Sequence, residues 1–380
     1  VIRGFQYRFY PTKPQEQKLA QAFGGARYVY NWGLQLRTNA WYQDQKRVNY
    51  QDTSALLTEL KKQPEHVWLN DCSSVVLQQS LRHLQSAFER FWQKMSGYPA
   101  FKKKHGPQSA TYASSAFTFK NGVLKIAKVG ILKIRWSRRF QAKPTTVTIS
   151  RNAANQYFVS FRVDELLPKA AKAKRSVGID FGINAFATAS DGSKCYAPKP
   201  LKKYLAKLKR QQKALSRKQK GSKNRAKAKL ALARTHVKIA NIRKDFIHKF
   251  TTKIIRENQA IFVEDLNLRG MVRSHCLAQA LSDVSIGEAM RQLQYKAEWY
   301  GRTLQKVDRF YPSSKRCHVC GWIIDKLPLS NRHWLCPKCE TLHDRDDNAS
   351  KNIQAEGQSA LNSGDGVRPI RSQGRKGICR

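Results

Sequence analysis

The residues best suited to chemistry lie near the C-terminus of the sequence. Cys317, Cys320, Cys336 and Cys339 are spaced C-x2-C-x15-C-x2-C. Each C-x2-C turn brings two thiolates to one side of a loop, and two such turns complete a tetrahedral zinc site. Because a closed four-thiolate site leaves no position for water, its zinc is structural rather than catalytic. Buried thiols or a redox pair are the alternative to a metal site.

Three carboxylates form a second candidate site. Asp180 and Glu264 each lie at the end of a predicted apolar strand, and Asp346 lies near the start of a predicted helix. Three carboxylates held together require a cation, and hard oxygen ligands select Mg²⁺ or Mn²⁺. In two-metal sites, ions about 3.5–4 Å apart clamp the attacking and leaving oxygens of a phosphodiester displacement. Taken singly, each aspartate could instead cap a turn or a helix.

The charge of the chain indicates its partner. The sequence has 71 Lys and Arg against 26 Asp and Glu, a formal net charge of +45. Such a surplus favours a nucleic-acid partner over a membrane surface or an acidic protein. No apolar run of about 18 residues is present, so no membrane span is expected. The start of the chain lacks the apolar core of a signal peptide, and the other cysteines are scattered singly, which together predict a cytoplasmic protein.

The positive charge is densest in residues 201–250, which hold eighteen Lys or Arg and a single acid, Asp245. We predict two basic helices hinged near Gly221 and Ser222. The alternative to nucleic-acid binding is a charged helix face exposed to solvent. However, almost no acids are present to form i,i+4 pairs, so the repulsion among the basic side chains favours contacts with phosphate. The candidate contacts are Lys209, Arg210, Arg217, Lys218, Arg225 and Arg243.

Several elements must position these residues. A short strand at residues 5–10 has no local partner, so we expect it to pair with the β-rich segment 111–163, making the helices between them an insertion. A charged linker at 165–176 marks the main domain boundary. The strand 177–183, with the turn that follows it, is typical of the start of a ribonuclease H-like sheet. Predicted helices begin at Pro14 and cover Ala26–Trp41, Val75–Trp92, Ser282–Arg302 and, with Asp346 at its N-terminus, 344–353.

Several segments match the motifs of one known family. They are Gly178–Ile183, Val263–Leu266, Tyr295–Gly301, Tyr311–Gly321 and His343–Ile353, with Phe9–Thr12, Gly25–Asn31 and Gly97–Lys103 at the front. With these motifs the chain resembles, over nearly its whole length, the transposon-encoded TnpB nucleases, compact relatives of type V CRISPR effectors.

The resemblance implies a Mg²⁺-dependent (or Mn²⁺-dependent) RNA-guided DNA endonuclease of RuvC type. Its guide would be a transposon-end omega RNA that pairs with double-stranded target DNA next to an adjacent motif. It would act as a monomer with its RNA and associate with the nucleoid when on target. Asp180, Glu264 and Asp346 would be the catalytic carboxylates, and Tyr50 and Gln78 would approach the motif duplex. Ser74 replaces a lysine of some relatives, so the motif sequence stays open.

The implied fold class is α/β plus β. A RuvC, ribonuclease H-like domain with a zinc-ribbon insertion follows a β-barrel-like wedge domain with a helical recognition insertion. The expected boundaries are 1–10 and 101–170 for the wedge, 11–100 for recognition, 171–312 and 341–356 for RuvC, 313–340 for the zinc-bearing target-nucleic-acid-binding insertion and 357–380 for a disordered basic tail.

Two other functions are compatible with the charge. An RNA-guided DNA-binding regulator would have lost cleavage, and its usual mark is a missing catalytic carboxylate. A guide-free, structure-specific nuclease of the junction-resolving type would leave some 170 residues ahead of the catalytic domain without a role. A strand-transferring transposase is a weaker reading than either.

Overall fold

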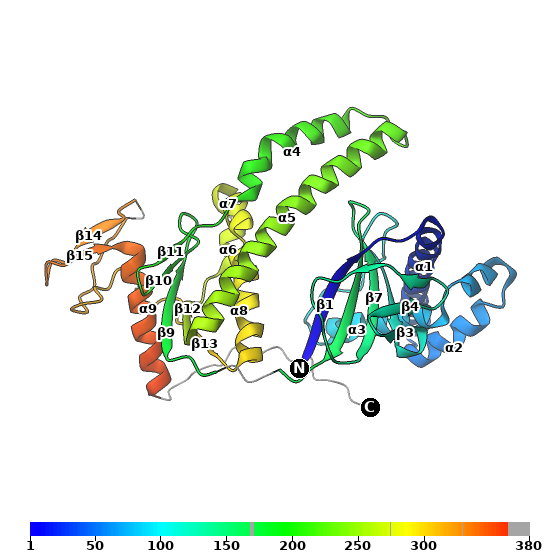
Figure 1. Cartoon of the computed structure of the whole chain (residues 1–380), viewed down its shortest axis with the longest axis horizontal. Coiled ribbons are helices and arrows are strands. Elements are labelled where there is room, and N and C mark those ends of the chain that lie inside the picture. Colours follow the sequence, from blue (N-terminus) through cyan, green and yellow to red (C-terminus); the bar gives the residue numbers. More distant parts are fainter. Residues whose placement is uncertain (168–170, 274, 329, 364–380) are drawn as a thin grey trace. The chain divides into compact units, whose positions relative to one another are not determined.

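The computed structural model describes residues 1–167, 171–273, 275–328 and 330–363 (Figure 1). The chain divides into two compact units, Val1–Leu166 and Leu167–Arg380. In the described part, no helix is long and apolar enough to cross a membrane.

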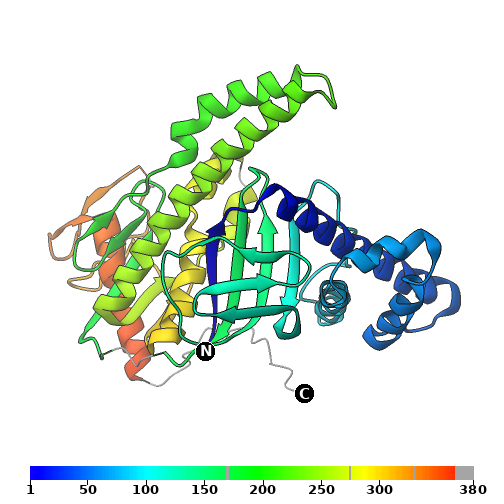
Figure 2. The ribbon, with the colours of Figure 1, turned by 45° about the vertical axis from the view of Figure 1, so that its right-hand side comes forward.

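The first unit is built on two antiparallel sheets (Figure 2). Strand β1 (Ile2–Phe9) pairs along its length with β8 (Tyr157–Asp164), with Phe5 opposite Phe161, which confirms the predicted pairing of the isolated first strand. Apolar residues alternate along β1, so Phe5, Tyr7 and Phe9 all enter a core shared with Leu124 of the smaller sheet. The larger sheet has the order β2 (Gln108–Ala113), β7 (Pro144–Arg151), β8 (Tyr157–Asp164), β1 (Ile2–Phe9) and β6 (Ile134–Arg135). The smaller sheet contains β3 (Phe117–Lys120), β4 (Val123–Ile126) and β5 (Gly130–Leu132).

The helices of this unit lie between β1 and β2 in sequence. The predicted break between two helices near residue 25 is wrong, because α1 runs unbroken through it. A side chain at Gly25 would lie 2.7 Å from Cys72 Sγ, so the glycine is kept for close helix packing rather than for a turn. The helices are α1 (Lys13–Asp44), α2 (Tyr50–Leu60), the 3-10 helix η1 (Pro64–Asp71) and α3 (Ser74–Trp92), followed after β2 by η2 (Ser114–Ala116). Helix α3 confirms the predicted helix over Val75–Trp92.

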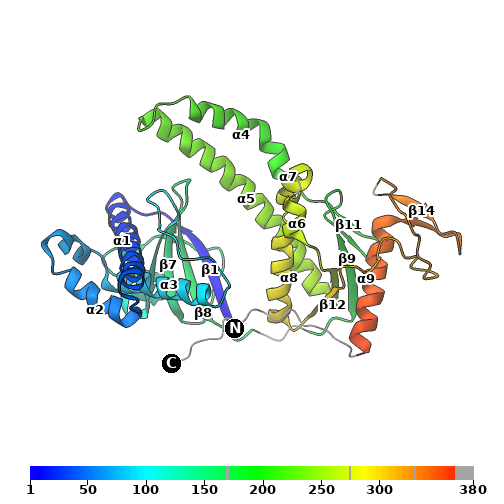
Figure 3. The same ribbon diagram turned by 180° about the vertical axis from the view of Figure 1, so that it is seen from behind.

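The second unit contains a mixed five-stranded sheet. Its order is β11 (Lys194–Cys195), β10 (Ala187–Ala189), β9 (Arg175–Phe181), β12 (Asn258–Glu264) and β13 (Thr303–Val307). Strands β9, β12 and β13 are parallel, whereas β10 and β11 run antiparallel. Helix α9 (Arg345–Asn362) covers one face of the sheet, and α5 (Lys223–Glu257) and α8 (Ile286–Tyr300) pack on the other (Figure 3).

The helices of this unit are α4 (Pro200–Ser216), α5 (Lys223–Glu257), α6 (Leu268–Arg273), α7 (His275–Val284), α8 (Ile286–Tyr300) and α9 (Arg345–Asn362). Helices α4 and α5 confirm the two predicted basic helices. The predicted helix at 282–302 is shorter, because Ser285 has φ 60° and separates α7 from α8. Asp344, not Asp346, caps α9. The predicted tail begins too early, since α9 continues to Asn362; residues 364–380 lie outside the described residues.

Two glycines set how closely α9 approaches the sheet. A side chain at Gly178 of β9 would lie 2.2 Å from the carbonyl oxygen of Ser350, and one at Gly357 would lie 2.2 Å from the ring of Phe262 on β12. The helix therefore packs directly on the two central strands. Its N-terminus follows from the hairpin of β14 (His333–Leu335) and β15 (Leu342–Asp344), which belongs to the cysteine-containing segment.

Candidate functional site

The register of two parallel strands brings Asp180 and Glu264 together. Val263 of β12 stands opposite Ile179 of β9, so the next residue on each strand is a carboxylate. Side chains alternate between the faces of a sheet. Because Gly178 and Phe262 face α9, Asp180 and Glu264, two residues further along, face α9 as well.

The third carboxylate comes from the first turn of α9. The side chain of Asp344 accepts hydrogen bonds from the amides of Asp346 and Asp347 at 3.1 and 3.0 Å. Asp344 also pairs with Lys194 of β11 at 2.8 Å. One cap thus fixes the start of α9 to the same sheet that carries the other two carboxylates.

The pKa of Asp180 reflects its two carboxylate neighbours. Burial, together with the charges of Glu264 and Asp346, raises this pKa to about 7, against the opposing effect of Arg345 and Arg332. A carboxyl group with this pKa holds its proton weakly at neutral pH and gives it up when a cation is supplied. The charges of Glu264 and Asp346 therefore reach Asp180, although these three carboxylates are not a group whose ligand atoms all lie within 4.8 Å of one another.

Two residues without a predicted role contact this cluster. Arg332, from the cysteine-containing segment, places Nη1 3.2 Å from Asp346 Oδ1. Ser313 donates a hydrogen bond from its hydroxyl to Glu264 Oε1. Both residues lie in irregular loops, so composition and spacing gave no signal for their contacts. Ser313 belongs to the motif Tyr311–Gly321 that carried the resemblance but had no predicted role.

The raised pKa of Asp180 predicts pH-dependent cation binding. Below pH 7 a proton competes with the cation for this carboxylate, so we expect Mn²⁺ to bind about tenfold more weakly at about pH 6 than at about pH 8. Titration followed by electron paramagnetic resonance would measure this. Asp180→Asn, which cannot ionise, should bind weakly at both values. An affinity of the unmodified protein that does not change with pH would contradict the expectation.

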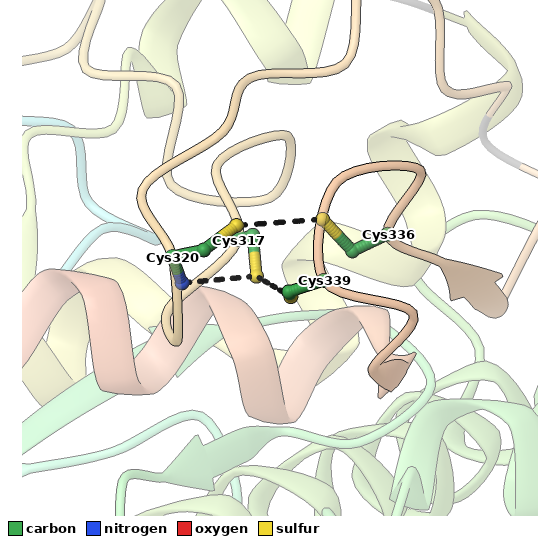
Figure 4. Close-up of side chains that lie close together, drawn as sticks. All are labelled: Cys317, Cys320, Cys336 and Cys339. Carbon is green, nitrogen blue, oxygen red and sulfur yellow. Dashed lines mark hydrogen bonds between the residues drawn. The ribbon is translucent and has the colours of Figure 1, made fainter.

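The four predicted zinc ligands converge (Figure 4). The Sγ atoms of Cys317 and Cys339 lie 3.6 Å apart, as do those of Cys320 and Cys336. Tetrahedral zinc with bonds near 2.3 Å requires sulfur atoms about 3.8 Å apart, so the spacing fits the ion. Among the described residues, these four are the potential metal ligands whose ligand atoms all lie within 4.8 Å of one another.

The surroundings of Cys339 favour its thiolate, and buried aromatic side chains pack beside the cysteines. Hydrogen bonds from the hydroxyl and amide of Thr341 lower the pKa of Cys339 to about 6. His343 is 2% exposed, and its Nε2 lies 3.1 Å from Cys317 Sγ. Trp334 packs against the His343 ring with centroids 4.7 Å apart. His343 belongs to the motif that carried the resemblance but had no predicted role.

The predicted basic contacts fall into two groups. Lys209 and Arg210 are exposed on α4, and Arg217 and Lys218 lie at its C-terminal end and in the turn that leads to α5. The other two are engaged within the protein. Arg225 donates to the carbonyl oxygens of Leu215 and Lys218 at 2.9 and 2.6 Å, which closes the turn between α4 and α5.

Arg243 belongs to the same second group. It pairs at 3.0 Å with Asp283, whose side chain is 5% exposed. Asp283 also accepts the amides of Leu201 and Lys202 at the start of α4, both at 2.9 Å. Asp283 was not predicted as functional, and these contacts make it a structural anchor at the base of the α4–α5 hairpin.

Tyr50 and Gln78 lie in the helical part of the first unit. The Tyr50 hydroxyl accepts a hydrogen bond from Arg82 Nε at 3.2 Å. Gln78 is exposed on α3, one helical turn before Arg82. Residues four apart are neighbours on a helix surface, so the two predicted residues flank one arginine.

Comparison with known families accounts for much of the chain. Residues 156–275 match the OrfB_IS605 family, described as a probable transposase. Residues 287–353 match the Cas12f1-like TNB domain. Residues 1–46 match a helix-turn-helix domain of OrfB_IS605 proteins, although here they form β1 and the single helix α1.

Individual relatives match over their whole length. A candidate RNA-guided DNA endonuclease of Streptomyces pristinaespiralis is 47% identical over 99% of this chain and 94% of its own. The Escherichia coli protein InsQ, given the same description, is 30% identical over 98% and 97%. A Cas12f1–guide RNA–target DNA complex solved by cryo-electron microscopy contains a chain of similar fold, with a TM-score of 0.58 at 13% identity over 93% of this chain and 98% of that one.

Proposed function

Because the chain belongs to the transposon-encoded TnpB family of RNA-guided DNA endonucleases, we propose that it cuts double-stranded DNA by metal-dependent hydrolysis, with Asp180, Glu264 and Asp346 as the catalytic carboxylates. The observation that carries the proposal is the electrostatic cluster of these three side chains at the carboxyl ends of β9 and β12. A regulator that has lost cleavage is not favoured, because the cluster is complete.

Each of the three carboxylates would contribute to binding the cations. Bound Mg²⁺ or Mn²⁺ would stabilise the charge on the attacking and leaving oxygens of the phosphodiester. Asp180 is the carboxylate whose pKa is raised by burial and by the charges of the other two, and its ionised form would be a ligand. Glu264 is fixed by Ser313 and Asp346 by the first turn of α9. Arg332, beside Asp346, is placed to contact the scissile phosphate once a cation binds the carboxylate.

The domain organisation follows the family. The order of the sheet in the second unit, with its first strand central and flanked by its second and fourth, supports a RuvC, ribonuclease H-like domain over 171–312 and 341–356. The converging cysteines support a structural zinc in the insertion 313–340. The two sheets of the first unit and the helices between β1 and β2 support a wedge domain with a recognition insertion.

The partners would be a guide RNA and a target DNA with an adjacent motif, because base pairing reads the sequence while the protein holds the backbones. The α4–α5 hairpin supplies exposed cations for a strand, among them Lys209 and Arg210. A single carboxylate cluster must cut both DNA strands, so we expect the strands to be cut one after the other.

The test is to co-express the chain with its flanking transposon-end DNA and sequence the RNA that copurifies. The particle is then given a plasmid library with randomised sequence beside the target, in Mg²⁺. We expect one defined RNA and cutting that depends on a short adjacent motif. Bound RNA without cutting would support the regulator, and cutting by protein freed of RNA would support the guide-free nuclease.

A further inference from the structure

The loop of residues 313–318 reaches both sites of the second unit. At its start, Ser313 is 5% exposed and donates its hydroxyl hydrogen to Glu264 Oε1. Four residues later comes Cys317, the first of the converging thiols. A single short loop thus contacts a carboxylate of the cluster at one end and supplies a ligand of the cysteine site at the other.

Two buried asparagines hold this loop on α9. Asn352 Nδ2 donates to the carbonyl oxygens of Ser313 and Arg316 at 2.8 and 2.5 Å. Asn348 Nδ2 donates to Arg316 at 2.8 Å, and its Oδ1 accepts the amide of His318 at 3.0 Å. Asn348 and Asn352 are 1% and 3% exposed. Because buried polar groups are costly to leave without partners, these bonds define one position for the loop.

The same helix carries Asp346. Asn348 and Asn352 follow it by two and six residues along α9, so the cluster and the clamp are parts of one rigid element. The carboxylate of Glu264 ends β12, a strand on which α9 packs directly. The hydroxyl of Ser313 is therefore held at a fixed distance from both the strand and the helix that bear the carboxylates.

We infer that Ser313 is a positioning residue for Glu264, held in place by Asn348 and Asn352. Its hydrogen bond occupies one carboxylate oxygen, which fixes the rotamer and presents the other oxygen to the cation. The inference rests on the proposed function, since it assigns Ser313 a role in metal binding at that site.

The test compares two adjacent serines. Ser313→Ala removes the hydroxyl that contacts Glu264, whereas Ser314→Ala removes a half-buried hydroxyl of the same loop outside this contact. The RNA-loaded protein is assayed for target cleavage over a range of Mg²⁺ concentrations. We expect Ser313→Ala to need about tenfold more Mg²⁺ for half-maximal cleavage, because the variant loses one hydrogen bond to a charged group. Cleavage at saturating Mg²⁺ and guide-RNA binding should change much less.

The conservative variant supplies the second readout. Ser313→Thr keeps a hydroxyl and should bring the Mg²⁺ requirement back toward that of the unmodified protein, while Ser314→Ala should leave it unchanged. The inference is overturned if Ser313→Ala needs no more Mg²⁺ than Ser314→Ala. It is also overturned if cleavage and RNA binding fall together at every Mg²⁺ concentration, because the serine would then serve only the fold.

A third variant separates this inference from the proposed function. Glu264→Gln should be inactive at every Mg²⁺ concentration. If it cleaves normally, the assignment of the cluster fails and the role of Ser313 fails with it. If it is inactive while Ser313→Ala has an unchanged Mg²⁺ requirement, the inference fails alone.

Discussion

Replacing Asp180 with alanine is expected to reduce target cleavage by about a thousandfold or more while leaving guide-RNA binding unchanged. Burial and the charges of Glu264 and Asp346 raise the pKa of this side chain, and its loss would remove one of the three proposed ligands of the cation. Single-turnover cleavage of a plasmid target, measured beside RNA binding by filter retention, would test both parts of the expectation.

The folding of the variant can be checked independently. The pKa of Asp180 is raised above its ordinary value, so the folded chain loses stability as the pH rises from about 4 to about 7, and the full penalty is present above that pH. Asp180→Ala should therefore unfold at the same or a higher temperature at about pH 8 without Mg²⁺. The matched control is Asp245→Ala, which removes an exposed acid of α5 that pairs with Lys249. Near-normal cleavage by Asp180→Ala would refute the assignment.

Replacing Cys336 with serine is expected to release the zinc and to lower cleavage by about a hundredfold or more. Cys336 is fully buried in the cysteine cluster, and structural zinc supplies much of the folding energy of a small module. Without the ion, the segment that holds Arg332 beside Asp346 and Ser313 beside Glu264 loses its fixed form. Zinc content measured by mass spectrometry, together with cleavage, would show the two losses.

A cysteine outside the module provides the comparison. Cys195→Ser changes a half-buried thiol of β11 and should keep both the zinc and the activity. RNA binding should persist in both variants, because the exposed cations of the α4–α5 hairpin lie on other elements. A Cys336→Ser protein that lacks zinc yet cleaves at the normal rate would show that the module does not support the carboxylate cluster.

The sequence predicted those elements that are specified by residues close to one another in the chain. The C-x2-C turns specify their own geometry, and the apolar runs before Asp180 and Glu264 indicate strand ends regardless of what packs on them. The break expected near Gly25 failed because a glycine permits a turn and close packing equally, and only Cys72, remote in sequence, decides between them. The contacts of Arg332 and Ser313 depend on irregular loops, whose paths have no periodic pattern.

Charge was the least specific signal. Composition cannot distinguish a basic side chain that is exposed to bind phosphate from one that makes structural contacts within the protein. Arg210 and Arg243 belong to the same basic run, yet Arg210 is exposed whereas Arg243 is bound by Asp283. The difference depends on the buried Asp283, some forty residues from Arg243 in the sequence. Nothing in the sequence distinguished Asp283 from other helix residues.

The anchoring of the α4–α5 hairpin at Asp283 has a practical consequence for engineering. From Arg243 to its first residue, α5 extends about 30 Å at 1.5 Å per residue. The base of the hairpin is fixed by Asp283, and α4 and α5 pack on each other. Removing matched whole turns from both helices would therefore shorten the hairpin without changing β9 or β12, the strands that carry Asp180 and Glu264.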